Sequence, residues 1–341
     1  MGVNCSCISN NLCNIEVNKS ENSTKNSNYI ISKNFPYDIS KVTKLQLYMK
    51  SYLNRKTETK QTKLIFSKSF TSSSFSVTDQ TSITQYQLDN LFNKYPPSKD
   101  GIKVSLVQLC FQNQAEYSGE WNPKLKERHG RGIQLWVDKT LYMGQWKNDK
   151  IHGQGKLIHP NSGYYEGSFV DDHAEGYGVY VHNNGSTYIG FWKRDLQEGK
   201  GKESWPNKLE YEGEYKEGKK NGQGKLTLHD GSVYIGSFIN NKIEGEGVYK
   251  WSNQQEYKGT FKNNKMDGEG VFTWPDGRVY KGHYYNDKKN GYGEFTWPNG
   301  KIYKGFWKNG KQNGEGVVYN PKEDRWEKGY WNEGRRVQWF R

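Results

Sequence analysis

The chain has 341 residues, of which 33% are hydrophobic and 15% aromatic, and it carries a formal net charge of +13. A chain with so many aromatic residues is not disordered over its whole length, because disordered chains are poor in them. A mean hydropathy of −1.05 is too low for a single conventional globular domain. No apolar run approaches the roughly 18 residues that a membrane-spanning helix needs. The positive charge favours anionic partners, whether acidic lipid, nucleic acid or acidic protein.

The first six residues fit a lipidation pattern. Gly2 is placed as the acceptor of a myristoyl group, with a serine at the favoured hydroxyl position. Cys5 and Cys7 supply palmitoylation sites beside it, and a second lipid is needed because one myristoyl chain binds membranes only marginally. The alternative is a chance glycine with unmodified thiols. Since no apolar signal-peptide core follows, we expect a cytosolic protein whose residues 1–37 form an acylated flexible tether.

A basic amphipathic helix is predicted over residues 38–57. Leu45 and Gln46, followed by Lys50 and Arg55, match the IQ motif, although a serine replaces its usual glycine. An apolar stripe at helical spacing supports the helix: Val42, Leu45, Met49, Tyr52 and Leu53. Such a helix can bind a calmodulin-like protein. The alternatives are that it packs on the first repeat or lies on a membrane.

Residues 58–100 are predicted to be a linker that contains a short helix. Residues 57–81 are rich in Ser, Thr and Lys, whereas apolar residues between Tyr86 and Phe92 suggest a helix that ends before Pro96. A strand over residues 102–109 then leads into the rest of the chain. We expect the helix and this strand to cap the N-terminal end of the structure that follows.

From Tyr117 onward one pattern recurs about every 23 residues: aromatic-x-Gly-x-aromatic, and later Gly-x-Gly. The anchor tyrosines are Tyr117, Tyr142, Tyr165, Tyr188, Tyr211, Tyr234, Tyr257, Tyr280 and Tyr303, and a truncated further copy ends near Trp331. Copies in register at a fixed spacing are the signature of a repeat architecture. Residues 101–341 are therefore predicted to form one array.

Each copy predicts a β-hairpin. In a strand, the two rings and the glycine of Tyr142-x-Gly144-x-Trp146 point to one face. A ring from a neighbouring hairpin is expected to lie over a glycine, because glycine within a strand implies close approach by another group. Pro-Asp-Gly at 275–277 and Pro-Asn-Gly at 298–300 predict the turns that join hairpins. The predicted fold is all-β, an elongated single-layer twisted sheet of about nineteen short strands.

These motifs resemble the MORN (membrane occupation and recognition nexus) repeat family, of the long-array type found in protists. The resemblance covers about two-thirds of the chain. It implies a scaffold or membrane-contact element rather than an enzyme, since enzymatic relatives carry a separate catalytic domain that we do not expect here. The repeats also show no sequence pattern typical of a catalytic site, because their histidines occupy different positions from one repeat to the next.

Lysines recur where the two strands of each hairpin are expected to join: Lys147, Lys150, Lys193, Lys216, Lys219, Lys242, Lys262, Lys265, Lys288, Lys308 and Lys311. A repeat of constant length would align them along one edge, as candidate contacts to anionic lipid. The alternative is that Asn-Lys is good turn chemistry and keeps strands from pairing with other chains. Nucleic-acid binding is not expected, because the rings are used in packing.

We therefore expect a scaffold without metal or cofactor, at the cytoplasmic face of the plasma membrane or the cell cortex. It would organise unidentified protein partners and contact anionic lipid and a calmodulin-like protein. Two alternatives remain open: a structural subunit of a ciliary axoneme or cortical cytoskeleton, and a regulator of a separate phosphoinositide kinase. The truncated last repeat is a candidate homodimer contact.

Overall fold

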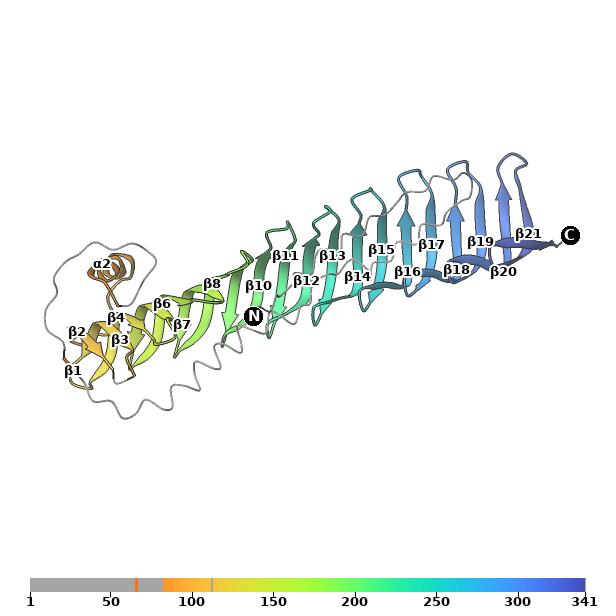
Figure 1. The fold of residues 1–341 in the computed structure, drawn as a ribbon. Coiled ribbons are helices and arrows are strands. Elements are labelled where there is room, and N and C mark those ends of the chain that lie inside the picture. Colours follow the sequence, from red (N-terminus) through yellow and green to blue (C-terminus); the bar gives the residue numbers. More distant parts are fainter. Residues whose placement is uncertain (1–64, 67–81, 112, 341) are drawn as a thin grey trace, which may run out of the picture.

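The computed structural model describes residues 65–66, 82–111 and 113–340. Within these residues the chain forms one 22-stranded sheet and one helix, α2 (Gln85–Lys94). Figure 1 shows the sheet as a long twisted ribbon, with α2 lying over the face of its first strands. The predicted fold class, an elongated single-layer all-β sheet with a partly helical N-terminal segment, is confirmed.

The strands before and in the first repeats are β1 (Ile65–Phe66), β2 (Ser105–Cys110), β3 (Glu116–Asn122), β4 (Glu127–Leu135), β5 (Leu141–Lys147), β6 (Lys150–His159), β7 (Gly163–Val170), β8 (His173–His182), β9 (Thr187–Lys193) and β10 (Leu196–Ser204). The later strands are β11 (Glu210–Lys216), β12 (Lys219–Thr227), β13 (Val233–Ile239), β14 (Lys242–Lys250), β15 (Glu256–Lys262), β16 (Lys265–Thr273), β17 (Val279–Tyr285), β18 (Lys288–Thr296), β19 (Ile302–Lys308), β20 (Lys311–Asn320), β21 (Arg325–Asn332) and β22 (Arg335–Trp339).

The topology is a simple meander. Each strand pairs antiparallel with its neighbours in sequence, from β1 to β22. Such a sheet needs only short connections, so one repeat can be added after another without crossovers.

Two kinds of turn alternate along the ribbon. The turn within a repeat places two residues at positive φ, as at Asn263 (50°) and Asn264 (65°), which is the geometry of a type I′ hairpin and suits Asn and Asp. The turn between repeats ends on a glycine such as Gly277 (φ 86°), whose N–H donates to the carbonyl of Trp274 (3.0 Å). The turns predicted at 275–277 and 298–300 are thus confirmed.

Each anchor tyrosine covers the glycines of its own hairpin. A Cβ atom on Gly247 would lie 2.5 Å from the hydroxyl oxygen of Tyr234, and one on Gly236 would clash with the same ring. The expectation that a ring from a neighbouring hairpin covers the glycine is therefore wrong. The Tyr234 ring extends forward along its own strand, over Gly236, and reaches Gly247 because that residue pairs with Gly236.

The first glycine of each Gly-x-Gly is required for a different reason. Gly245 has a φ of 78° and lies where β13 and β14 shift register. A Cβ atom there would face Ser237 at 3.5 Å rather than a ring. This position needs glycine for its left-handed backbone at a bulge, not for ring packing.

The rings form one continuous line, which we call the ring ladder. Tyr234 meets Phe238 of its own repeat and Phe261 of the next edge to face, with centroids 5.3 and 5.2 Å apart. This alternation runs without a break from Trp121 to Trp331. Such pairs contribute about 0.5–1.5 kcal/mol each beyond burial, so the ladder joins the repeats. We call its side of the sheet the ladder face and the other side the open face.

Helix α2 packs on the open face, not on the end of the sheet. Leu88 and Leu91 are buried in one cluster with Ile133, Leu135 and Leu141 of β4 and β5. The expectation that the helix caps the N-terminal end is wrong for this reason: its apolar side meets the face of the first repeats. The predicted strand over 102–109 is present as β2, which begins at Ser105.

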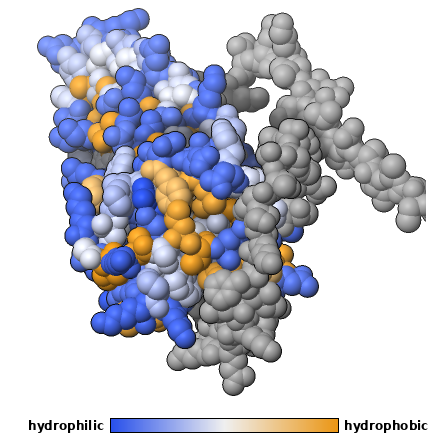
Figure 2. Space-filling view, turned by 90° about the vertical axis from the view of Figure 1, so that its left-hand side faces the viewer, coloured by the Kyte–Doolittle hydropathy of each residue, from blue (hydrophilic) through white to orange (hydrophobic). Residues whose placement is uncertain are grey.

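The N-terminal end of the sheet is formed by β2 and the short β1. Figure 2 looks onto this end, where hydrophobic side chains gather in a strip between hydrophilic ones. Leu106 of β2 is 70% exposed. The described residues thus leave apolar surface uncovered at this end of the array.

Candidate functional site

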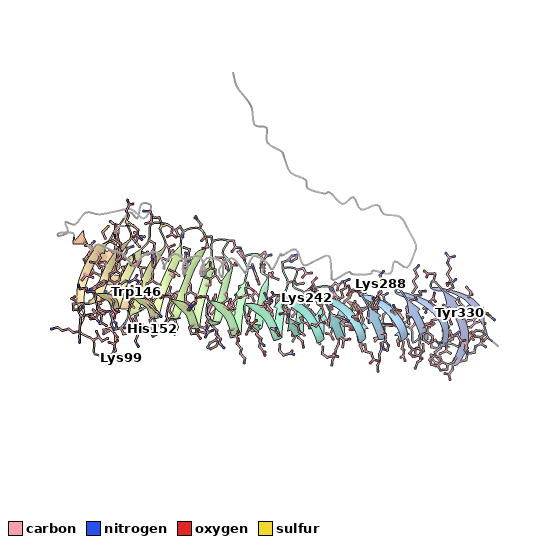
Figure 3. The ribbon with its side chains drawn as sticks, turned by 90° about the horizontal axis from the view of Figure 1, so that it is seen from below. Lys99, Trp146, His152, Lys242, Lys288 and Tyr330 are labelled. Carbon is pink, nitrogen blue, oxygen red and sulfur yellow. The ribbon has the colours of Figure 1, made fainter. Side chains whose placement is uncertain are left out.

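The lysines predicted to contact lipid lie at the turns within the repeats. Each is the last residue of the first strand or the first residue of the second strand of its hairpin: Lys147, Lys150, Lys193, Lys216, Lys219, Lys242, Lys262, Lys265, Lys288, Lys308 and Lys311. All are exposed except Lys265, which is half-buried. We call this row the lysine edge, and Figure 3 labels Lys242 and Lys288 in it.

The charge of the lysine edge is least compensated in its middle. Lys242 and Lys265 donate to the side-chain oxygens of Asn263 (2.8 Å) and Asn286 (3.2 Å), which carry no charge. At the C-terminal end Lys311 lies 2.9 Å from Glu333 and holds the pKa of that carboxyl below its usual value.

The N-terminal part of the same edge is different. The turn of the third repeat carries Asp171 and Asp172 and no lysine, and Lys150 lies 3.6 Å from Asp171. The basic stretch therefore runs mainly from Lys193 to Lys308. Sequence spacing alone does not reveal this interruption, because it depends on which turns become neighbours.

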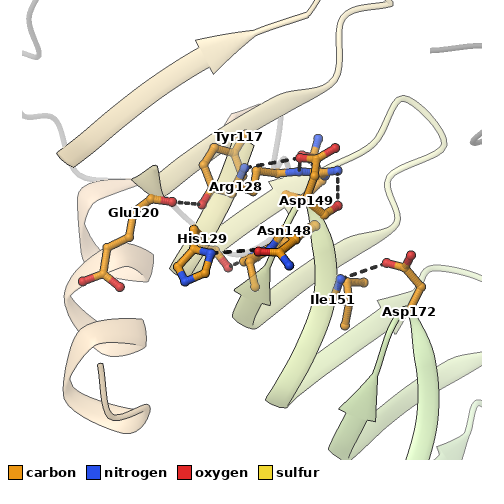
Figure 4. A network of polar contacts seen from close by, with 11 residues as sticks. Tyr117, Glu120, Arg128, His129, Asn148, Asp149, Ile151 and Asp172 are labelled. Carbon is orange, nitrogen blue, oxygen red and sulfur yellow. Dashed lines mark hydrogen bonds and ion pairs between the residues drawn. The ribbon is translucent and has the colours of Figure 1, made fainter. Parts of the chain in front are cut away.

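Successive turns are also linked by hydrogen bonds that sequence reasoning missed. Asn264 donates its backbone N–H to the carbonyl of Ile243 (3.0 Å), and its side-chain oxygen accepts the N–H of Ile243 (2.7 Å). Figure 4 shows the matching bond between Ile151 N–H and Asp172 Oδ1 (2.8 Å). The Asn or Asp at the end of each turn is the signal that could have revealed these links.

The open face carries a helix at its beginning. The Arg131 guanidinium lies 4.6 Å from the centroid of the Phe92 ring of α2, and Lys94 pairs with Glu166 (2.5 Å). Gln145 donates to the carbonyl of Pro96, just beyond the helix (2.9 Å). Apolar packing and these polar contacts together fix α2 across the first repeats.

Beyond α2 the open face carries exposed aromatic pairs. Tyr177 pairs with Phe191 across β8 and β9, and Tyr292 with Phe306 across β18 and β19. Their ring centroids are 5.6 and 5.8 Å apart, and the side chains are half exposed. These rings do not belong to the ring ladder, and their exposed parts are candidate contacts for a partner.

Lys289 is a half-buried lysine on the ladder face, and its amine lies among four aromatic rings. Its Nζ lies 4.3 Å from the ring centroid of Phe295 and 4.8–4.9 Å from those of Trp307, Trp274 and Tyr280. Burial lowers its pKa to about 7, with a further contribution from the charge of Arg278. The rings favour the charged form, but none of the ion pairs of the described residues involves Lys289.

The equivalent lysine three repeats earlier is paired. Lys220 Nζ lies 2.7 Å from Glu203 Oε2, and Tyr215 donates its hydroxyl to the same oxygen (3.1 Å). Both lysines therefore fill the same place in the core, and only one has a counter-charge among its described neighbours. We assign neither a catalytic role.

The described part of the chain contains no group of His, Cys, Asp and Glu side chains that could hold a metal ion. None of its helices is long and apolar enough to cross a membrane. The lipidation residues Gly2, Cys5 and Cys7 lie outside the described residues, as do the IQ-like residues Leu45, Gln46, Lys50 and Arg55.

The MORN repeat family model matches nine consecutive segments of the chain: residues 117–140, 142–164, 165–187, 188–209, 211–233, 234–256, 257–277, 280–302 and 303–325. Among solved structures, the chain is similar to the SAS-4 (dCPAP) TCP domain of Drosophila melanogaster, with 12% identity and a TM-score of 0.27, over 56% of this chain and 96% of that one.

Two further solved structures resemble it to the same degree. One is the TCP10 domain of Danio rerio CPAP, with 13% identity and a TM-score of 0.27, over 72% of this chain and 99% of that one. The other is the CPAP G-box domain, with 12% identity and a TM-score of 0.29, over 67% and 100%. TM-scores of this size do not indicate a shared fold.

Proposed function

Because the chain belongs to the MORN repeat family, as matches over residues 117–325 show, we propose that it is a non-enzymatic scaffold held at a membrane. The observation that carries this proposal is the long open face, which α2 covers only at its beginning and which bears exposed aromatic pairs from Tyr177 to Phe306. A single-layer ribbon of this length can hold several protein partners side by side.

The membrane attachment that we propose has two parts. Lipid chains on Gly2, and on Cys5 and Cys7, insert into the bilayer, since one myristoyl chain alone binds with K of only about 10⁴ M⁻¹. The lysine edge then faces the anionic headgroups, where each lysine contributes roughly 1 kcal/mol. A spacing of about 9.6 Å per repeat, two strands of about 4.8 Å each, places successive lysines against successive lipids.

The attachment is tested first by fractionation. In its native cell the wild type is expected in the membrane fraction, and Gly2→Ala is expected mostly in the soluble fraction. Cys13→Ser is the matched control, because it removes a thiol but leaves the proposed sites. If Gly2→Ala leaves the distribution unchanged, the lipid anchor is wrong.

The lysine edge is tested separately with vesicles. Reversing Lys216, Lys242, Lys262 and Lys308 to glutamate is expected to lower binding of the full chain to phosphatidylserine vesicles by at least tenfold, because charge near the surface is lost. A control reverses four lysines of the open face: Lys202, Lys225, Lys258 and Lys281. Equal losses in both variants would contradict contact through the edge.

One alternative function is supported by the C-terminal end of the sheet. There Trp326, Tyr330 and Val337 are exposed, and among the described strands β22 pairs only with β21. An unpaired strand edge with apolar residues favours association with another chain. End-to-end pairing of two copies suits a structural subunit of an axoneme or cortical cytoskeleton. Resistance to detergent extraction in the Gly2→Ala variant would favour this alternative.

A further inference from the structure

Helix α2 shows how the open face holds a helix. Its seat consists of three cross-strand pairs of β4 and β5: Arg131–Gln145, Ile133–Met143 and Leu135–Leu141. Leu88 and Leu91 of the helix are buried against this seat, and Ile133, Leu135 and Leu141 beneath it are at most 7% exposed. Because the repeat has a constant length, the equivalent pairs can be followed along the sheet, and the middle pair shows where the face stays apolar.

Between β6 and β21 the middle pair is apolar at one place. There Val179 of β8 stands opposite Ile189 of β9, and the pairs beside it are Tyr177–Phe191 and Val181–Thr187. We call these six residues the second seat. In the other equivalent strand pairs the middle pair includes a charged residue: Lys156–Glu166, Lys202–Glu212, Lys225–Ile235, Val248–Lys258, Val271–Lys281, Glu294–Lys304 and Val317–Lys328. The second seat is therefore a separate apolar patch on a mostly charged face.

The described residues leave the second seat largely uncovered. Tyr177, Phe191 and Ile189 are 54%, 50% and 39% exposed, whereas α2 covers the equivalent part of the first seat. Exposed apolar patches bordered by polar residues mark sites of protein interaction. Strands β8 and β9 are hydrogen-bonded on both sides, so a partner cannot add a strand here and has to lie on the face, as α2 does.

The acidic residues beside the two seats also correspond. Lys94, in the last turn of α2, pairs with Glu166 of β7 (2.5 Å), two strands beyond the first seat. Glu212 of β11 has the same position relative to the second seat, and its side chain is exposed. Lys202, which stands opposite Glu212, lies 3.3 Å from Glu210 instead. None of the ion pairs of the described residues involves Glu212, so its charge favours a basic residue on a helix bound at the second seat.

We propose that the second seat binds an amphipathic helix of a partner protein. The bound helix has the pattern of α2: two apolar residues at i and i+3, as Leu88 and Leu91, and a basic residue at i+6, as Lys94. Positions i and i+3 share one face of a helix, and the basic residue then lies beside Glu212. This inference rests on the proposed scaffold function, in which the open face holds protein partners, and it names the kind of partner.

A copy of α2 is the probe that tests the second seat. The probe is a fluorescent peptide of residues 82–97 in which Tyr86→Lys and Asn90→Glu are joined by a lactam bridge. Both positions are exposed in α2, and the bridge is needed because so short a helix is marginal in water. The peptide is expected to bind the second seat of the full chain, since the chain's own α2 fills the first, and fluorescence anisotropy measures the affinity.

Variants of the sheet show where the peptide binds. Y177S/F191S is expected to weaken binding at least tenfold, because the largest apolar contacts are lost. The matched control is Y292S/F306S, which removes the equivalent ring pair beside the charged middle pair Glu294–Lys304 and should leave the affinity unchanged. Equal affinity for the wild type and Y177S/F191S would overturn the proposal, as would absence of binding to the wild type at about 1 mM peptide.

A charge exchange tests the proposal without altering the apolar residues of the seat. The peptide with Lys94→Glu is expected to bind the wild type about fivefold more weakly, as for loss of an exposed ion pair. Glu212→Lys in the full chain is expected to restore its affinity. Glu214→Lys is the control, because Glu214 is exposed on the same strand but does not correspond to Glu166. Restoration by neither variant, or by both equally, would contradict the proposed arrangement.

Two further measurements separate this inference from its alternatives. Self-association of the wild type that Y177S/F191S abolishes, measured by sedimentation, would assign the seat to a second copy and overturn the proposal. Failure of the proposed membrane attachment would appear elsewhere, as an unchanged membrane fraction of Gly2→Ala, because the peptide assays contain no membrane.

Discussion

The ring of Tyr234 meets the ring of Phe261 in the next repeat edge to face, with centroids 5.2 Å apart and planes inclined by 83°. Phe261 packs in the same way on Tyr257 of its own repeat, at 5.1 Å. Each second aromatic therefore lies between two anchor tyrosines. A sheet normally buries one face against another layer, and here the ring ladder replaces that layer.

Replacing the glycine beneath a ladder ring should weaken the array. In Gly247→Ala the new methyl group would overlap the Tyr234 ring, whose hydroxyl donates to the carbonyl of Ser237 (3.1 Å). We expect a loss of about 2–4 kcal/mol in the free energy of unfolding, measured with urea. Val248→Ala, on the open face, is the control and should cost about 1 kcal/mol. Equal costs would show that the ring does not depend on this glycine.

Removing a link between turns should also destabilise the chain. Asn264→Ala loses the acceptor for the Ile243 N–H and places alanine at a φ of 65°, which should cost about 2 kcal/mol. Asn264→Asp is expected to be nearly neutral, because Asp287 accepts from Met266 N–H in the same way (2.8 Å). A large loss in the aspartate variant, measured by thermal unfolding, would contradict the role of this bond.

Adding a side-chain acceptor should stabilise a turn that lacks this hydrogen bond to the preceding turn. Gly310 donates its N–H to the carbonyl of Lys289 (2.8 Å) but has no side chain to accept in return. Gly310→Asn adds that acceptor at a φ of 86°, which asparagine tolerates. We expect a gain of about 0.5–1 kcal/mol in unfolding free energy. Gly231→Asn, at a similar φ in a turn between repeats, is the control and should bring no gain.

The amine of Lys289, enclosed by four rings, should make stability depend on pH. Its pKa of about 7 lies below its ordinary value of 10.5, so the folded chain binds fewer protons than the unfolded chain between these values. Charging the enclosed amine destabilises the folded chain, so the free energy of unfolding rises with pH between 7 and 10.5. The stability that the neutral amine allows is fully present above pH 10.5 and is lost as the pH falls towards 7. Lys289→Met, which copies Met266 at the equivalent position, should add about 1–3 kcal/mol at pH 7.

The same variant should flatten the rise in stability between pH 7 and 10. The control is Lys288→Met, since Lys288 is exposed and its removal should leave both stability and pH dependence unchanged. Urea unfolding at several pH values measures both. A loss of stability in Lys289→Met would show that the four surrounding rings outweigh the cost of burying the charge.

The docking of α2 can be tested on the helix itself. Leu91 is 2% exposed, and Leu91→Ala should cost about 2–4 kcal/mol and speed hydrogen exchange of residues 85–94. Tyr86 is on the same helix but 74% exposed, so Tyr86→Ala should have little effect. If exchange of α2 is unchanged in Leu91→Ala, the helix is held by its polar contacts with Arg131 and Glu166 instead.

Much of the fold could be predicted from local spacing. Tyr, Gly and the second aromatic at alternate positions indicate one face of a strand, and Pro-Asp-Gly at 275–277 indicates a turn. The direction in which the tyrosine folds could not be predicted this way. It follows from the register that places Gly236 opposite Gly247, and that register includes a bulge at Gly245 which alternation alone does not reveal.

The candidate site was less predictable. The positions of Lys242 and Lys288 at the turns follow from the repeat, but their ionic surroundings depend on side chains of the next turn. Tyr177 and Phe191 resemble other strand aromatics in the sequence. Only the pairing of β8 with β9 shows that their rings meet on the open face, away from the ring ladder.

By itself the sequence determined the repeat, its hairpins and the order of its strands, because all of these depend on contacts within one repeat or between adjacent repeats. Tertiary structure alone decided that α2 lies on the open face, that Lys289 is enclosed by rings, and that Tyr177 and Phe191 stay exposed. The physical reason is that these features depend on packing between residues distant in sequence, and no local spacing specifies such packing.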